Sequence, residues 1–375
     1  MSQNQGTRRS NQLRRGALAA VAFSLIGMVA LFRFSGGRNA WRELAKIDVR
    51  VLLIACGLVL LTWVIDAVRM KVLVSSLGGH LSLARGIRIS ILGAFVSNVT
   101  PFDSGGEPFQ IYLLTSSDLT AGQSSAVVAV KTILNALARV TLGLAAVVML
   151  LTTSSQWSLP TPVNIAMATG ILIYVAIFSG FTYLLFKPEK ISAVATPAVR
   201  NKITLRFFRP ETLDAVLDRI DTELRAFRHA LDEFMNYHKL ALAEVLLLSF
   251  VCWISIISVP AVVLRGLGLR TPIVQIMAVT IVFYLAAAYA PTPGSSGAAE
   301  LGFAVLFSTI APRAVLGLFV TVWRLITYHF NLAVGGALMT LGVLKRDNRS
   351  QRRSPNTDES DVPPSPPSPP AASIS

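Results

Sequence analysis

The chain has 375 residues, of which 53% are hydrophobic and only 14% are charged, and its mean hydropathy is +0.59. A soluble domain carries about 25% charged residues, so this composition excludes a soluble globular protein and indicates a membrane protein with several spans. The net charge of +14 does not indicate a nucleic-acid partner, because the basic residues cluster beside apolar segments, as in membrane proteins.

A membrane-spanning helix needs about 20 apolar residues, and six stretches of the chain have this length. The first follows a basic N-terminal segment, 1–16, but no small-residue cleavage site follows it, so we expect it to be retained rather than removed as a signal peptide. The pattern predicts an all-α polytopic membrane protein whose membrane domain covers 17–344. The predicted full spans are 17–35, 50–70, 122–152, 163–186, 240–264 and 314–344.

Two further apolar stretches, 86–117 and 273–310, are interrupted by proline and glycine, and each carries a glutamate, Glu107 or Glu300. Proline and glycine break a helix, and backbone freed inside hydrocarbon must find partners in protein or in a water-filled cavity. We therefore predict two re-entrant or broken helical hairpins. The residues expected to set the breaks are Pro101, Gly105 and Gly106 in the first, and Pro291, Pro293, Gly294 and Gly297 in the second.

Two segments are polar. Apolar residues recur at helical spacing over 209–237 among Asp, Glu and Arg, which predicts an amphipathic helix in the cytoplasm. The tail, 345–375, is basic and then rich in proline and serine, and we expect it to be disordered.

Charge asymmetry predicts the orientation in the membrane. Basic residues precede the first span, follow the last and fill 187–239, whereas the loop 153–162 has no charge. The positive-inside rule then puts both termini and 187–239 in the cytoplasm, and 153–162 outside.

The two halves of the membrane domain, about 50–152 and 240–344, resemble each other at an offset of 190 residues, which becomes 193 after the longer second break. With the predicted orientation, the halves enter the membrane from opposite faces and form an inverted repeat, an architecture found in many secondary transporters. Two ordinary kinked spans are the alternative. The matched residues are Trp63 with Trp253, Gly78 with Gly268, Pro101 with Pro291, Glu107 with Glu300, and Lys131 with Arg324.

Several polar residues lie deep in predicted spans, where a charged side chain is expected to pair or to face a cavity. We expect Glu107 to pair with Lys131 or Arg139, and Glu300 with Arg324. These groups would either bind an anionic headgroup or only hold the hairpins against neighbouring spans. The candidate transport residues are Glu107, Glu300, Lys131, Asn135, Arg139, Arg324 and Tyr328.

Other chemistry has little support in the sequence. Asp66 and Arg69, at the end of the predicted span 50–70, are interpreted as an interfacial ion pair. The four histidines have no metal-ligand spacing, and no glycine-rich loop ends in Lys-Ser or Lys-Thr. We expect no metal, no cofactor and no catalytic residue.

The two broken motifs resemble a known family. Gly105-Gly106-Glu107-Pro108, then Pro-Thr-Pro-Gly-Ser-Ser-Gly-Ala-Ala-Glu at 291–300, and then Arg324-Leu-Ile-Thr-Tyr328 are similar to the flippase-like membrane domain of the lysylphosphatidylglycerol synthase family. The resemblance covers about 17–344 and implies a bacterial or archaeal inner-membrane protein that moves lipids between leaflets. This chain departs from the family at Gln110, where the family often has arginine, and we expect no aminoacyl-transferase activity.

These observations favour a flippase or scramblase of the bacterial inner membrane for an anionic phospholipid, a glycolipid or a polyprenyl-phosphate-linked lipid. Its partners would be membrane lipids and a separate lipid-modifying enzyme. The alternatives are an integral-membrane enzyme acting on lipid phosphates and a non-catalytic assembly or regulatory partner.

Overall fold

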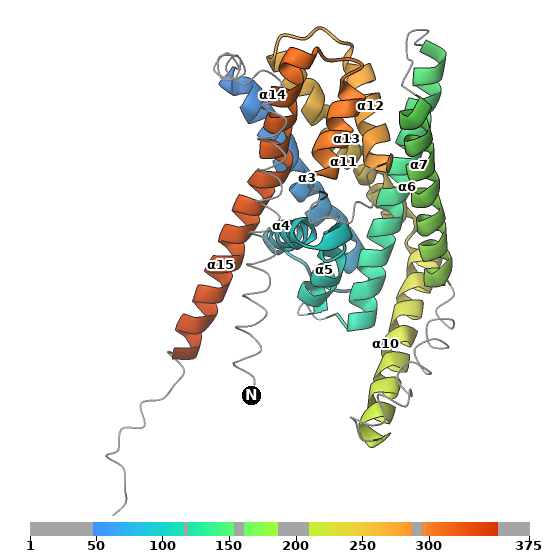
Figure 1. Cartoon of the computed structure of the whole chain (residues 1–375). Helices are drawn as coiled ribbons and strands as arrows, with labels where there is room; N and C mark the ends of the chain where they lie inside the picture. Colours follow the sequence, from blue (N-terminus) through green and yellow to red (C-terminus); the bar gives the residue numbers. More distant parts are fainter. Residues whose placement is uncertain are drawn as a thin grey trace, which may run out of the picture.

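The computed structural model describes residues 48–115, 119–153, 161–186, 210–286, 295 and 297–351, and the regular elements in these ranges are all helices (Figure 1). The chain is therefore an all-α membrane protein, as its composition predicts. The predicted first span, 17–35, lies outside the described residues. Four described helices are long and apolar enough to cross a membrane: Val49–Ser76, Ala121–Leu150, Lys239–Gly266 and Arg313–Leu341.

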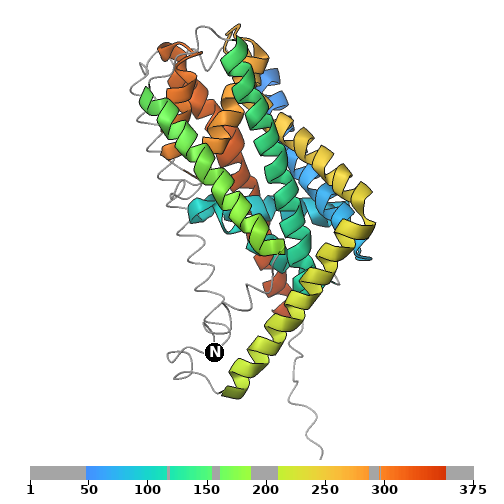
Figure 2. The ribbon, with the colours of Figure 1, turned by 90° about the vertical axis from the view of Figure 1, so that its right-hand side faces the viewer.

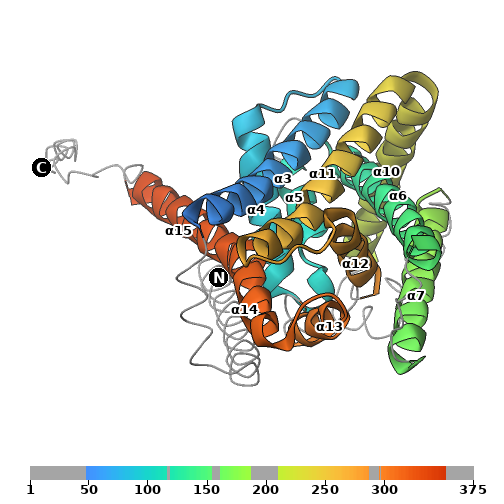
Figure 3. The ribbon, with the colours of Figure 1, turned by 90° about the horizontal axis from the view of Figure 1, so that it is seen from above.

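Helices α3 (Val49–Ser76) and α11 (Lys239–Gly266) pack side by side along the core of the molecule. They run in opposite directions, because α3 begins and α11 ends at the same end of the molecule (Figures 1 and 3). Both helices contribute to one apolar cluster, in which Val59, Trp63 and Leu264 are buried. The pairing joins one helix from each half of the sequence.

The first predicted hairpin is a pair of short helices, α4 (Leu83–Val99) and α5 (Gly106–Thr115), joined by a turn of 3₁₀ helix, η1 (Pro101–Asp103). The backbone of Phe102 is left-handed there, with φ 58°. The Thr100 hydroxyl accepts a hydrogen bond from the Gly105 amide at 3.0 Å, which satisfies a backbone group freed by the break.

Two glycines bring α4 and α5 into close contact. A Cβ on Gly93 would meet the side chain of Gln110, and a Cβ on Gly106 would meet the Ser97 hydroxyl and the Gly93 carbonyl. Without side chains at these positions, the two helices pack in close contact.

The second hairpin consists of α12 (Ile273–Ala286) and α13 (Ala298–Phe307). Ser295 and Gly297, just before α13, have φ of 54° and 84°. A glycine is therefore favoured at 297, as the predicted break requires. The other predicted break residues, Pro291, Pro293 and Gly294, lie outside the described residues.

The remaining spans flank these hairpins. Helices α6 (Ala121–Thr153) and α7 (Thr161–Phe186) lie side by side (Figures 1 and 2). On the other side of the molecule in Figure 1, α14 (Arg313–Arg324), a five-residue π-helix η3 (Leu325–His329) and α15 (Phe330–Gln351) form one long helical path. Helix α15 continues past residue 344 into the segment for which disorder is predicted.

Helix boundaries follow the offset seen in the sequence. Helix α11 begins 190 positions after α3, and α12 begins 190 positions after α4. Glu107 and Glu300 each lie in the first turn of the second hairpin helix, α5 or α13. The antiparallel arrangement of α3 and α11 is the one that the predicted inverted repeat requires.

The amphipathic helix α10 (Pro210–Tyr237) closely matches the predicted range and leads into α11 (Figure 2). Its apolar face, including Phe227 and Phe234, is buried in a cluster shared with α6. The Glu223 carboxylate accepts a hydrogen bond from the Gly122 amide at 2.6 Å, at the N-terminus of α6. A carboxylate there satisfies a free amide and complements the helix dipole.

We predict that Gly106→Ala destabilises the hairpin by about 1–3 kcal/mol, because the added methyl group must displace Ser97 or the α4 backbone. Thermal unfolding of the detergent-purified protein would measure the loss. Gly57→Ala is the matched control: Gly57 lies in α3 with open space around it, so alanine there should be neutral or stabilising. Equal melting temperatures for Gly106→Ala and the wild type would contradict the close packing.

Candidate functional site

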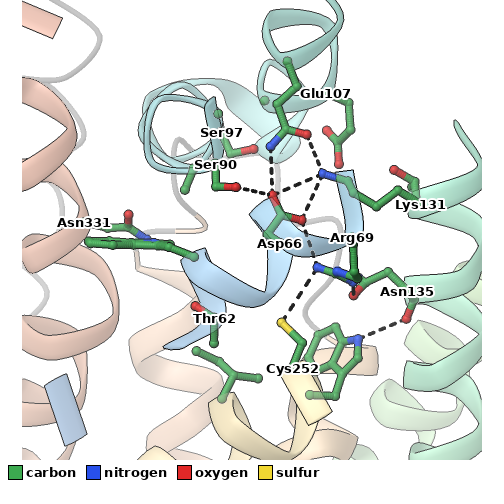
Figure 4. A pocket seen from close by; sticks show the side chains of 18 of the residues that line it. Thr62, Asp66, Arg69, Ser90, Ser97, Glu107, Lys131, Asn135, Cys252 and Asn331 are labelled. Atoms are coloured by element: carbon green, nitrogen blue, oxygen red, sulfur yellow. Dashed lines mark hydrogen bonds and ion pairs between the residues drawn. The ribbon is translucent and has the colours of Figure 1, made fainter. Parts of the chain in front are cut away.

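A cavity of about 320 Å³ lies between the first hairpin and helices α3, α6 and α11, with further residues from α12 and α15 (Figure 4). Both halves of the repeat therefore contribute to its wall. Charged and polar side chains from α3, α4, α5 and α6 face it: Asp66, Arg69, Ser90, Ser97, Glu107, Gln110, Lys131 and Asn135.

Asp66 is the centre of the polar network. Its carboxylate accepts from Arg69 Nη2 at 2.9 Å and lies 3.0 Å from Lys131 Nζ. It also accepts from the Ser90 hydroxyl at 2.8 Å and from Gln110 Nε2 at 3.3 Å. One carboxylate from α3 thus holds cations from α3 and α6 and polar groups from the hairpin (Figure 4).

Arg69 is 4% exposed and connects α3 to two other spans. Its Nη1 donates to Asn135 Oδ1 at 2.8 Å and to Ser249 Oγ at 3.0 Å. Its buried Nε has no hydrogen-bond partner. The predicted ion pair of Asp66 and Arg69 therefore forms, and because α3 continues to Ser76, the pair lies within the helix and not at its end.

Lys131 binds a different partner from the one expected. Besides Asp66, it donates to Gln110 Oε1 at 2.6 Å. Glu107 is exposed, lines the same cavity and makes no hydrogen bond or ion pair with the described residues. The predicted pair of Glu107 with Lys131 or Arg139 is not formed, because Asp66, which is nearer, accepts the ammonium group.

Arg139 is also engaged elsewhere. Its Nε donates to the Tyr174 hydroxyl at 3.0 Å, and its guanidinium lies 4.0 Å from the centre of that ring and 5.1 Å from the Trp253 ring. The Trp253 indole donates to the Asn135 carbonyl at 3.0 Å and separates Arg139 from the network. Asn135 is thus a cavity residue as predicted, whereas Arg139 is held by aromatic rings beside the cavity.

The second predicted ion pair does form. Arg324 Nε donates to Glu300 Oε1 at 2.8 Å, and Glu300 is 0% exposed. The same carboxylate accepts from the Gly297 amide at 2.6 Å, at the start of α13. Tyr328 lies beneath Arg324, with the guanidinium 4.3 Å from its ring centre.

Corresponding positions in the two halves have different side chains. Gly93 and Gln110 are replaced by Phe283 and Phe303, whose rings are 5.0 Å apart. Phe303 also stacks on Trp323 at 3.8 Å. The space that forms a polar cavity in the first half is therefore filled by aromatic rings in the second, and Glu300, Arg324 and Tyr328 are not part of the cavity wall.

The sequence did not identify Asp66, Arg69, Ser90 and Gln110 as site residues. The sequence does contain a signal: an acid and a base three residues apart within a 28-residue apolar helix. This signal indicates a buried pair only if the span is taken to continue beyond the two residues. Within the described ranges, no group of three or more His, Cys, Asp or Glu side chains has an arrangement suited to a metal ion.

The sequence profile described as the transmembrane region of lysylphosphatidylglycerol synthase matches residues 17–335. The chain belongs to this family. Members similar to it include a UPF0104 membrane protein of Archaeoglobus fulgidus, 27% identical over 88% of this chain and 97% of the relative. A UPF0104 membrane protein of Pyrococcus horikoshii is 23% identical over 87% of this chain and 97% of the relative. No solved structure is significantly similar to the chain.

For this family member, we predict that Glu300→Gln lowers the free energy of unfolding by about 3–5 kcal/mol, because Arg324 stays buried without its carboxylate. Glutamine can still accept from the Gly297 amide, so the substitution tests the charge. The double variant Glu300→Gln/Arg324→Met also removes the buried cation and should be more stable than Glu300→Gln alone. Thermal unfolding would rank the variants, and a single variant as stable as the wild type would contradict the pair's importance.

Proposed function

We propose that the chain moves a lipid with a phosphate-bearing headgroup between the leaflets of its membrane, as a flippase or scramblase, without changing the lipid chemically. The observation that carries this proposal is that two cations of the cavity wall share one carboxylate, while Glu107, the other carboxylate of the wall, is exposed and binds neither of them. Asp66 faces two cations, Arg69 and Lys131, so the buried network has one positive charge more than its carboxylate can balance. An excess charge inside a membrane protein is costly unless it meets a counter-ion, and a lipid phosphate carries the matching charge.

Lys131 and Arg69 are the proposed phosphate ligands. Lys131 offers an ammonium group, and the Nε of Arg69 is a buried donor without a hydrogen-bond partner. Arg139 and Arg324 have other roles, since Tyr174 and Glu300 hold them. Phosphate is common to anionic phospholipids, many glycolipids and polyprenyl phosphates, so the site fits all of these classes.

The family membership supports a role that concerns membrane lipids. We further propose an inner-membrane location with both termini in the cytoplasm, on the basis of the charge asymmetry. A separate lipid-modifying enzyme would then act on the same lipid before or after its movement.

Liposomes containing the full chain and a labelled lipid of each class would test the proposal, with the label in the outer leaflet destroyed chemically to measure crossing. Lys131→Met and Arg69→Met each leave Asp66 with one cation, so both variants should fold but lose the excess charge. We expect each to slow crossing by about tenfold or more. Asp218→Asn, on the exposed face of α10, is the control and should cross as fast as the wild type.

Two outcomes would overturn the proposal: no lipid crosses with the wild type, or Lys131→Met and Arg69→Met cross as fast as the control. Mass spectrometry of the recovered lipids would detect a chemical change, which would indicate an enzyme instead.

A further inference from the structure

Both halves have a glutamate and a cation at corresponding positions, but these two residues form an ion pair only in the second half. In the second half, the glutamate in the first turn of α13 is bound by the cation that follows 24 residues later, Arg324. In the first half, the corresponding residues are Glu107 and Lys131, also 24 residues apart. Lys131 binds Asp66 instead, and Glu107 is exposed.

One difference between the halves explains why the cation of the first half has a competing partner. The position that corresponds to Asp66 in the second half is Ile256, so no second carboxylate competes with Glu300 there. In the first half, Lys131 has two carboxylates within one cavity, Asp66 and Glu107, because both line its wall (Figure 4). The neighbouring Gln110 accepts a hydrogen bond from Lys131 at 2.6 Å and so helps to keep Lys131 beside Asp66.

We propose that Lys131 exchanges Asp66 for Glu107 when the first hairpin closes over the cavity, and that the closed first half then has the ion-pair arrangement seen in the second. This proposal rests on the proposed transport function, for which it supplies the gate. Glu107 is thus a positioning residue that acts through Lys131.

The exchange gives each of the two cations a carboxylate of its own in the closed state. When Lys131 leaves, Asp66 remains bound to Arg69 at 2.9 Å, and Glu107 gains a cation as it becomes buried. Because Gly93 and Gly106 join α4 and α5 closely, the hairpin can carry Glu107 toward α6 as a rigid unit. The aromatic packing of Phe283, Phe303 and Trp323 explains why the second half is already closed.

The rate at which a reagent modifies Cys252 can show whether the cavity is open or closed. Cys252 lines the wall, and Cys56, the other cysteine, does not. In a Cys56→Ser background, the rate at which a charged, water-soluble methanethiosulfonate modifies Cys252 measures how long the cavity is open. The full chain in liposomes is suitable, with labelling after denaturation as the reference for total thiol.

We expect Asp66→Asn to slow the labelling of Cys252 by about tenfold, the change that a shift of about 1.4 kcal/mol toward the closed state produces. Electrostatics alone predicts the opposite, because removing a carboxylate near Arg69 and Cys252 favours the reactive thiolate. Adding Glu107→Gln to Asp66→Asn should restore the wild-type rate. Unchanged or faster labelling of Asp66→Asn, or no restoration in the double variant, would overturn the exchange.

Gln110→Leu is a second route to the same test if Asp66→Asn does not fold. This substitution removes the hydrogen bonds of Gln110 to Lys131 and Asp66 without changing a charge, so the labelling of Cys252 should again slow. Adding Glu107→Gln should again restore the wild-type labelling rate. Asp218→Asn should leave the rate unchanged. If lipid crosses but labelling does not respond, only the exchange is wrong; if labelling responds but no lipid crosses, the transport function is wrong.

Discussion

The structure depends on one partly exposed carboxylate that holds two buried cations. Asp66 joins Arg69 on its own helix to Lys131 on α6, and through Ser90 and Gln110 it also fixes the hairpin. Inside a membrane domain a charge needs partners, so these contacts determine how α3, α6 and the hairpin meet. Because Glu107 is exposed and binds neither cation, these contacts leave the Asp66 network with one positive charge in excess, and the proposed function follows from that excess.

The two halves of the membrane domain have different side chains at corresponding positions. In the second half, aromatic rings fill the space beside Glu300 and Arg324. In the first half, Gly93 and Gln110 leave room for a cavity, and Asp66 supplies a carboxylate that the second half lacks. Among the described residues, the two halves therefore differ at the positions that correspond to the cavity wall.

The broken helices make this site possible. Backbone that leaves its helix inside a membrane must be satisfied locally, and Thr100 does so by accepting from the Gly105 amide. The break also brings the first turn of α5, with Glu107, to the cavity. A continuous helix through 86–117 would carry these groups past the membrane centre.

The sequence by itself determined the helical class, the positions of the hairpins, the amphipathic helix and the Glu300–Arg324 pair. These features rest on local signals: apolar length, helix-breaking residues, helical periodicity and a repeated spacing. Only the tertiary structure decided which carboxylate binds Lys131. Asp66 lies 65 residues from Lys131 in the chain, and no spacing rule connects them. The packing of α3 against α6 and the hairpin brings them within 3.0 Å, and so prevents the pair that the repeat predicts.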